Sequence, residues 1–234
     1  MTGSERAFAL GSFSIGGCPP FAGVVTDRGV VAVEALRSVS ERSGLPLVGA
    51  ESVFGLLQRW PENLAALAAA LEAARRAAPS AFVPVEQLAV HVPFEPRTIY
   101  AAGANYRQHV IDIIVDRHSD PALSPEENRR RASARMDERA ANGVPYVFLK
   151  SNASLNGPHD DVRLPPDAKQ PDWEVELALV IGRTARHVNR ADAFNLIAGY
   201  AIANDISDRA FTFRPEEREL GADWLASKDR KSVV

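Results

Sequence analysis

Three acidic residues on two neighbouring predicted strands form the strongest chemical signal in this sequence. Glu174 and Glu176 stand two residues apart in the segment DWEVELALVIG, which alternates like a β-strand. Side chains alternate along a strand, so both carboxylates point to one face. Asp205 ends the next apolar segment and could supply a third carboxylate. Oxygen ligands suit Mg²⁺, Mn²⁺ or Ca²⁺, and mutual repulsion among the acids favours a bound cation. An acidic strand face in water is the simpler alternative.

A histidine and an aspartate form a second candidate for chemistry. His109 and Asp112 stand three residues apart in a segment that should begin a helix near Tyr106, so they share one helix face. A carboxylate beside a histidine orients the ring and raises its basicity, which suits a general base for water. A surface pair at the start of a helix is the alternative.

Three basic residues near these acids could hold an anionic substrate or an enolate. Lys150 ends the segment PYVFLK, Arg209 follows Asp205 by four residues, and Lys228 ends the segment DWLASK. Each could stabilise developing negative charge. Most lysines and arginines are ordinary surface cations, so residue type alone does not decide between the two roles.

The composition excludes several classes of function. The 234 residues are 46% hydrophobic and 24% charged, which is enough apolar material for a sizeable core. A net charge of −3 argues against a nucleic-acid partner. The sequence has no apolar run of about 18 residues, so no membrane span is expected, and its N-terminus lacks signal-peptide features. One cysteine, Cys18, excludes an internal disulfide framework, and we expect a cytoplasmic protein.

Residues 1–95 are predicted to form a small α/β domain. Strands over 21–25 and 29–35 flank a Thr-Asp-Arg-Gly turn, which is a hairpin signal. An alanine-rich helix over 61–78 has a proline in its first turn and should be core scaffold. Together with the strand-rich domain that follows, this pattern makes the fold class α+β.

Residues 96–234 are predicted to form a second, mainly β domain with a helical, lid-like insertion at 113–143. Within the insertion, Ser124 and Glu127 form a capping box, so a helix should begin there and end at Asn142. Its arginine run most simply faces water, and less simply helps to hold an anionic substrate. Strands are predicted over 98–102, 146–149, 173–182 and 196–203.

Five segments of this domain, taken in order, resemble the catalytic core of the fumarylacetoacetate hydrolase superfamily. They are GANYRQH, PYVFLKSNASLNGP, DWEVELALVIGRTAR, AGYAIANDISDR and DWLASK. The resemblance covers residues 98–228 and is specific as a set, although no single motif is. It implies a catalytic β-roll and a homodimer. Residues 1–95 resemble the variable N-terminal domain of the family more loosely.

The resemblance also implies roles for individual residues. It implies Glu174, Glu176 and Asp205 as ligands of Mg²⁺ or Mn²⁺, with Ca²⁺ as a further option. It implies His109 as the base, with Asp112 standing where the family commonly has glutamate. The positions that should contact substrate or enolate are Lys228, Arg209, Lys150, Tyr106 and Thr212. Some members carry glutamine at the last of these positions, which weakens any assignment to fumarylacetoacetate itself.

The implied reaction is hydrolysis of a C–C bond in a 2,4-dioxo acid, such as an acylpyruvate or a fumarylacetoacetate-like compound. Water activated by His109 and Asp112 attacks the distal carbonyl, and the metal and Lys228 stabilise the departing enolate. Decarboxylation, isomerisation or hydration of 2-oxo or 2-hydroxydienoic acids in aromatic catabolism uses related chemistry and is an alternative.

The end of the sequence departs from the family pattern. Family chains normally continue past the DWLASK lysine through a Gly-Pro strand and a Thr-Gly-Thr-Pro-x-Gly loop, whereas this sequence ends DRKSVV. We therefore expect the C-terminal part of the domain to be missing, which would expose sheet edges. An inactive truncated fragment, or a module that binds an anionic metabolite without turnover, is the non-enzymatic alternative.

Overall fold

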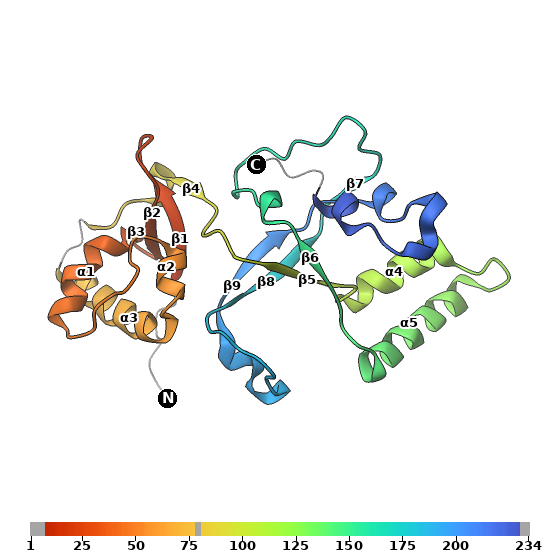
Figure 1. Cartoon of the computed structure of the whole chain (residues 1–234), viewed down its shortest axis with the longest axis horizontal. Helices are drawn as coiled ribbons and strands as arrows, with labels where there is room; N and C mark the ends of the chain where they lie inside the picture. The colour runs from red at the N-terminus through yellow and green to blue at the C-terminus, as the bar shows by residue number, and fades with distance from the viewer. Residues whose placement is uncertain (1–7, 78–80, 230–234) are drawn as a thin grey trace. The chain divides into compact units, whose positions relative to one another are not determined.

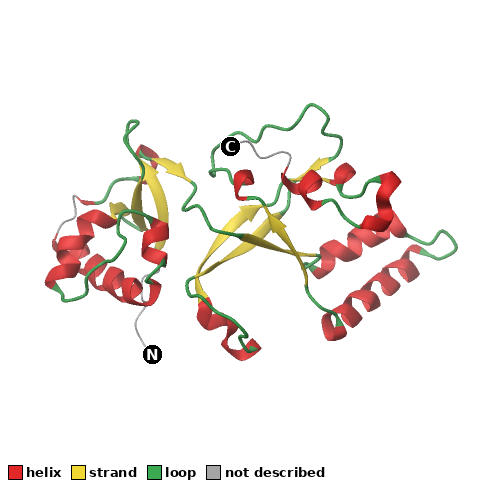
Figure 2. Ribbon diagram, viewed as in Figure 1, coloured by secondary structure: helices red, strands yellow, loops and turns green. Residues whose placement is uncertain are grey.

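The computed structural model describes residues 8–77 and 81–229. Contacts divide the chain into an inserted unit, residues 98–151, and a main unit, formed by residues 1–97 and 152–234. Helices and strands occur in both units, which confirms the predicted α+β class (Figure 2). Residue 78, where the alanine-rich helix was predicted to end, and residues 230–234 lie outside the described ranges.

The N-terminal part of the main unit is built on an antiparallel sheet with strand order β3-β2-β1-β4. The predicted hairpin is confirmed, because Thr26 pairs with Gly29 at the turn. The four strands are β1 (Ala9–Ser14), β2 (Phe21–Thr26), β3 (Gly29–Ala32) and β4 (Ala89–His91).

Three helices pack with this sheet, and they are coloured orange in Figure 1. They are α1 (Val33–Arg42), α2 (Val53–Leu57) and α3 (Trp60–Ala77). The prediction that β3 continues to residue 35 is wrong, because α1 begins at Val33. Val33, Leu36 and Ser40 are buried at helical spacing, so the helix covers one face of the core. Leu67 of α3 is fully buried in the same core, which confirms the scaffold role predicted for that helix.

The inserted unit is a β-hairpin that carries two helices. Strand β5 (Ile99–Gly103) pairs antiparallel with β6 (Tyr146–Lys150). Between them lie α4 (Arg107–His118) and α5 (Pro125–Asn142), whose contact buries Ile111, Ala132 and Met136. The predicted cap is confirmed, since the Ser124 hydroxyl accepts a hydrogen bond of 3.2 Å from the backbone N–H of Glu127.

The strands of the main unit that follow the insertion form two short antiparallel sheets. Strand β8 (Val175–Ile181) pairs with β9 (Ile197–Asn204), and β7 (Pro171–Asp172) pairs with β10 (Ser207–Asp208). The remaining short helices are η2 (Val85–Gln87), η3 (Asn152–Ser154), η4 (Arg190–Leu196), η5 (Arg209–Phe211), η6 (Pro215–Leu220) and η7 (Leu225–Asp229).

The alternation predicted for β8 is present, with its apolar side turned to the solvent. Val175, Leu177, Leu179 and Ile181 are each more than half exposed, whereas the side chains between them are half-buried. We call these four residues the apolar row. The side of β8 that carries Glu176 is therefore less exposed to solvent than the side that carries the apolar row. This differs from an acidic strand face that lies in water, which was the simpler alternative.

Across the described ranges, none of the helices combines the length and apolar character that a membrane span requires.

Candidate metal centre

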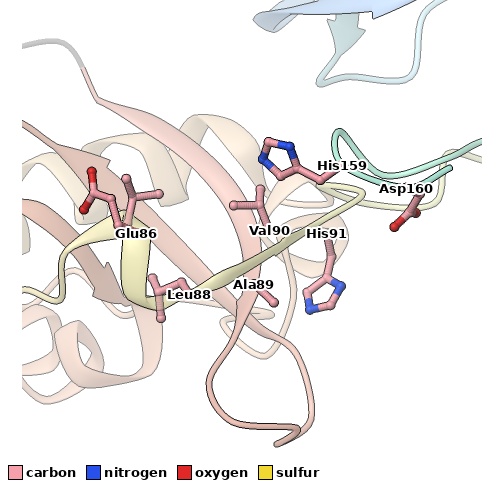
Figure 3. Close-up of a pocket in the computed structure, with 8 residues that line it drawn as sticks. Glu86, Leu88, Ala89, Val90, His91, His159 and Asp160 are labelled. Carbon is pink, nitrogen blue, oxygen red and sulfur yellow. The ribbon is translucent and has the colours of Figure 1, made fainter.

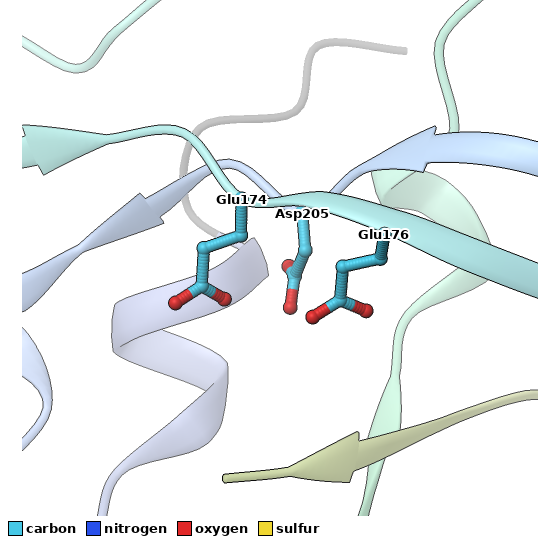
Figure 4. Close-up of side chains that lie close together, drawn as sticks. All are labelled: Glu174, Glu176 and Asp205. Atoms are coloured by element: carbon cyan, nitrogen blue, oxygen red, sulfur yellow. The ribbon is translucent and has the colours of Figure 1, made fainter. Parts of the chain in front are cut away.

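The structure brings the three predicted ligands together. Glu174, Glu176 and Asp205 each offer an oxygen, and these oxygens lie within 4.8 Å of one another. Figure 4 shows the three carboxylates pointing the same way, with Asp205 between the two glutamates. Within residues 8–77 and 81–229, no second group of three or more potential ligands converges in this way.

The pairing of β8 with β9 explains why the acids converge. The strands are antiparallel, with Val175 opposite Asn204, so the start of β8 lies beside the end of β9. Glu174 and Asp205 flank this first pair. The backbone N–H of Asp205 donates to the carbonyl oxygen of Glu174 at 2.8 Å, and the Glu174 N–H donates to the Asn204 side chain at 3.2 Å. Glu176 follows two residues later and points to the same face.

Two cations lie directly on these acids. The ammonium of Lys228 donates to the Asp205 carboxylate at 2.7 Å and to Oε2 of Glu174, and Lys228 is only 3% exposed. Arg209 donates to Oε1 of Glu174 and, through Nε, to Asp172 at 3.0 Å. Both residues were predicted as contacts of the substrate or enolate. The side-chain hydrogen bonds described above are with the acids, and a contact of Lys228 or Arg209 with substrate or enolate stays a prediction.

The pKa of Arg209 follows from these neighbours. Burial by itself would lower this pKa, because it disfavours the charged guanidinium. The charge of Glu174 and the hydrogen bonds to Asp172 and Glu174 outweigh burial, so the pKa of Arg209 is raised. The side chain therefore remains a permanent cation beside the acids. Asp172 stands two residues before Glu174 in the sequence, and this spacing is the signal that could have assigned it a role at the site.

Asp208 is a buried residue that the sequence analysis missed. It is fully buried, and its carboxylate accepts hydrogen bonds from the backbone N–H groups of Lys169, Gln170 and Ala210 at 3.0 to 3.2 Å. The bonds from Lys169 and Gln170 hold the segment that leads into β7 against β10, and the bond from Ala210 caps η5. Asp208 thereby fixes the chain shortly before Glu174. An aspartate three residues after the predicted ligand Asp205 was the only signal in the sequence.

Thr212 lies close to the helix that carries Lys228. Its hydroxyl lies 3.1 Å from the hydroxyl of Ser227, and its carbonyl accepts from the Asp223 N–H at 2.8 Å. These contacts help to fix η7 in the main unit. The predicted contact of Thr212 with substrate stays a prediction.

The other predicted residues belong to the inserted unit. His109 is exposed in the first turn of α4, and Tyr106 is the N-cap residue of that helix. One oxygen of the Asp112 carboxylate accepts from Gln108 and from Arg129, both at 3.0 Å. Lys150 is the last residue of β6. The described contacts of Asp112 are thus with residues other than His109, and the His109–Asp112 base stays a prediction.

An open pocket of about 460 Å³ lies at another place in the main unit (Figure 3). It is lined by Val85, Glu86, Leu88, Ala89, Val90, His91, His159 and Asp160. None of these residues belongs to the predicted site. Figure 3 shows Glu86 and Asp160 at opposite ends of the pocket, so its acids do not converge.

The strands, the acid cluster and the buried cations define an acid-lined centre on a two-stranded sheet. The chain belongs to the fumarylacetoacetate hydrolase family, since residues 98–234 match the family model for the fumarylacetoacetate (FAA) hydrolase C-terminal region.

Named relatives support this membership. Maleylpyruvate hydrolase of Aquipseudomonas alcaligenes is 29% identical over 212 residues, which cover 88% of this chain and 67% of that protein. A human mitochondrial oxaloacetate tautomerase is 42% identical over 84 residues, or 36% of this chain and 26% of the relative. The structure of maleylpyruvate hydrolase from Sphingobium sp. SYK-6 in complex with manganese (II) ion and pyruvate is similar with a TM-score of 0.55 and 25% identity. That match covers 86% of this chain and 59% of the other. Several relatives match over only about 26% of their own length.

Replacing Asp208 with alanine is expected to destabilise the main unit by about 3 kcal/mol, because three backbone N–H groups lose an acceptor that is itself fully buried. Asp208→Asn keeps one acceptor oxygen and should lose less. Urea unfolding would measure both changes. The control is Asp161→Ala, which removes an exposed carboxylate of the same unit and should change stability by less than about 0.5 kcal/mol. Equal losses in Asp208→Ala and Asp161→Ala would contradict the role of Asp208.

Proposed function

We propose that this chain provides the metal centre of a divalent-metal-dependent hydrolase that cleaves a C–C bond in a 2,4-dioxo acid. An acylpyruvate or a fumarylacetoacetate-like compound is the expected substrate class. The observation that supports this most directly is the convergence of Glu174, Glu176 and Asp205 within 4.8 Å. Membership of the fumarylacetoacetate hydrolase family and the similarity to two maleylpyruvate hydrolases agree with it.

The three acids fit a hard divalent cation. Oxygens that bind one Mg²⁺ at about 2.1 Å in octahedral geometry lie roughly 3 Å apart, so oxygens already within 4.8 Å need only small rotations. Asp172 adds a fourth carboxylate, and Arg209 and Lys228 add two cations. These six groups leave a formal charge of −2, which a divalent cation would neutralise. We propose Mg²⁺ or Mn²⁺, and the manganese named in the related complex supports the latter.

The residues of the chain divide the reaction between them. Glu174, Glu176 and Asp205 would hold a divalent cation, which would supply Lewis acidity to a 2-oxo acid. His109, oriented by Asp112, takes a proton from water, and the resulting hydroxide adds to the distal carbonyl carbon. The C–C bond then breaks, and its electron pair passes into a pyruvate-type enolate. Lys228 and Arg209 donate hydrogen bonds to the enolate, which is protonated to give a 2-oxo acid.

Isomerisation of a 2-oxo acid is a second candidate reaction. It needs the same enolate without water attack, and the 42% identity to an oxaloacetate tautomerase supports it. Decarboxylation and hydration use related enolate chemistry. A panel of an acylpyruvate, a fumarylacetoacetate-like acid, oxaloacetate and a 2-hydroxydienoate, with products identified by mass spectrometry, separates these reactions. Metal binding with no turnover on the panel would favour the metabolite-binding module.

We further propose that the chain forms a homodimer, and a cytoplasmic location stays a prediction from the sequence. The apolar row supports self-association, since contiguous exposed apolar side chains mark interaction surfaces. Its four side chains lie along one side of β8.

Glu174→Ala is expected to abolish both metal-dependent turnover and stabilisation by metal. In the wild type, Mn²⁺ at about 100 times its dissociation constant should raise the free energy of unfolding by roughly 2.7 kcal/mol relative to excess chelator. The variant also loses contacts with Arg209 and Lys228, so the metal-dependent difference is the quantity to compare. The control, Glu95→Ala, removes an exposed glutamate and should keep the full shift. If Mn²⁺ stabilises Glu174→Ala as much as the wild type, the assignment of Glu174 as a metal ligand is wrong.

His109→Asn is expected to lower kcat by about 10²-fold to 10⁴-fold, the usual contribution of a general base. Stabilisation by Mn²⁺ should stay at the wild-type value, because His109 is not among the proposed ligands. The control is His118→Asn, at the exposed end of the same helix α4, which should leave kcat unchanged. Loss of acylpyruvate absorbance measures kcat. Wild-type kcat in His109→Asn would remove this residue from the mechanism.

Light scattering should give the wild type a mass of twice the 25.4 kDa of one chain. Leu177→Glu is expected to shift the protein towards monomer, because a charge in an apolar interface must be desolvated. Val162→Glu, at an exposed apolar residue outside the row, is the matched control and should remain dimeric. A monomeric wild type, or equal effects of the two variants, would contradict this interface.

A further inference from the structure

Lys228 occupies the oxygens that a metal would need. Its ammonium donates to Oε2 of Glu174 and, at 2.7 Å, to Oδ2 of Asp205. The other oxygen of Glu174 accepts from Arg209. Both carboxylates are thus engaged by side-chain cations, and Lys228 and Asp205 are 3% and 6% exposed. A cation bound to Glu174 and Asp205 would have to compete with this ammonium for the same oxygens.

The backbone that carries Lys228 is anchored, whereas its side chain has rotatable bonds. The neighbouring Ser227 is 1% exposed, and its hydroxyl lies 3.1 Å from that of Thr212 and donates to the Asp208 carbonyl at 3.2 Å. Lysine has a flexible four-carbon stem and a compact charge. The ammonium can therefore leave the acids by rotation of the side chain while η7 stays in place.

We propose that Lys228 is a tethered counter-cation of the acid cluster. Before metal binds, its ammonium bridges Glu174 and Asp205 and offsets their repulsion. When metal binds, the metal ion and the Lys228 ammonium repel each other, and the ammonium leaves the acids. It then binds an anionic group of the substrate. This inference rests on the proposed function. It adds an order of events, in which metal binding releases the cation that then holds the 2-oxo acid.

An ordinary structural ion pair would behave differently. In that case Lys228 would support the ligands in the same way with and without metal, and its removal would weaken metal binding. A tethered counter-cation opposes metal binding, because the metal must displace it. Its removal therefore strengthens metal binding while it destabilises the metal-free protein. The two roles therefore predict opposite changes in metal affinity when Lys228 is removed: weaker binding for a structural ion pair, and tighter binding for a tethered counter-cation.

The first experiment measures Mn²⁺ affinity by calorimetry for the wild type, Lys228→Met and Lys169→Met. Methionine keeps an unbranched side chain only one atom shorter than that of lysine and removes its charge, and Lys169 is an exposed lysine of the same unit. Lys228→Met should bind Mn²⁺ roughly tenfold more tightly, about 1.4 kcal/mol. Without metal, its melting temperature should be lower than that of the wild type. Lys169→Met should match the wild type in both measurements.

Equal or weaker Mn²⁺ binding by a folded Lys228→Met would overturn the role of Lys228 and leave the metal centre intact. No Mn²⁺ binding by the wild type or either variant would overturn the metal centre itself, and the role of Lys228 with it. If Lys228→Met binds Mn²⁺ and the wild type and Lys169→Met do not, the result would support the proposal, because the ammonium would then exclude the metal completely. The two failures are therefore distinguishable.

A second measurement uses only the wild-type protein, so it does not depend on the folding of a variant. Amine acetylation with a water-soluble active ester, followed by mass spectrometry of peptides, reports how fast each lysine reacts. Without metal, the buried Lys228 should react more slowly than Lys169. Saturating Mn²⁺ should raise the rate at Lys228 several-fold and leave Lys169 unchanged. A rate at Lys228 that stays constant or falls on binding Mn²⁺ would overturn its release.

Discussion

Three carboxylates converge where β8 begins and β9 ends, and their mutual repulsion must be offset by nearby groups. Glu174, Glu176 and Asp205 lie within 4.8 Å, and like charges at this distance are costly in a partly buried setting. The chain places Arg209 and Lys228 on them, one on each oxygen of Glu174. Breaking one partner of a buried pair leaves an uncompensated charge and costs several kcal/mol. The positions of η5 and η7 therefore depend on the acids as much as the acids depend on them.

The register of the β8–β9 pair decides whether this cluster exists at all. Side chains alternate with a period of two, so a slip of one residue would turn Glu176 to the side of the apolar row. The backbone bonds between Glu174, Asn204 and Asp205 hold the pair at its end. Asp208 then fixes the segment before β7 through the backbone N–H groups of Lys169 and Gln170. Buried side chains that bond to backbone thus set the geometry of side chains that could bind a metal.

Local rules predicted much of this arrangement from the sequence, and long-range contacts account for the rest. The alternation of β8, the hairpin turn and the Ser124 cap each depend on neighbouring residues, and the structure confirms them. The start of α1 at Val33 was missed, because the valines before and at this position favour a strand by local propensity. The helix is stabilised instead by tertiary burial of residues at helical spacing. The contacts of Lys228 with Glu174 and Asp205 span 54 and 23 residues. No local pattern specifies such a partner, so the sequence showed a cation without showing where it binds.

The same charge balance bears on how the chain can fold before metal is present. A site made only of acids needs its ion for folding, as in small domains that are unfolded without metal. Here Arg209 and Lys228 supply two charges from within the chain, so the β8–β9 corner can assemble in the absence of metal. The remaining formal charge of −2 still favours a divalent cation. Under the proposed function, part of the energy of metal binding would replace contacts that Lys228 already makes, so metal would contribute to affinity for the anionic substrate more than to folding.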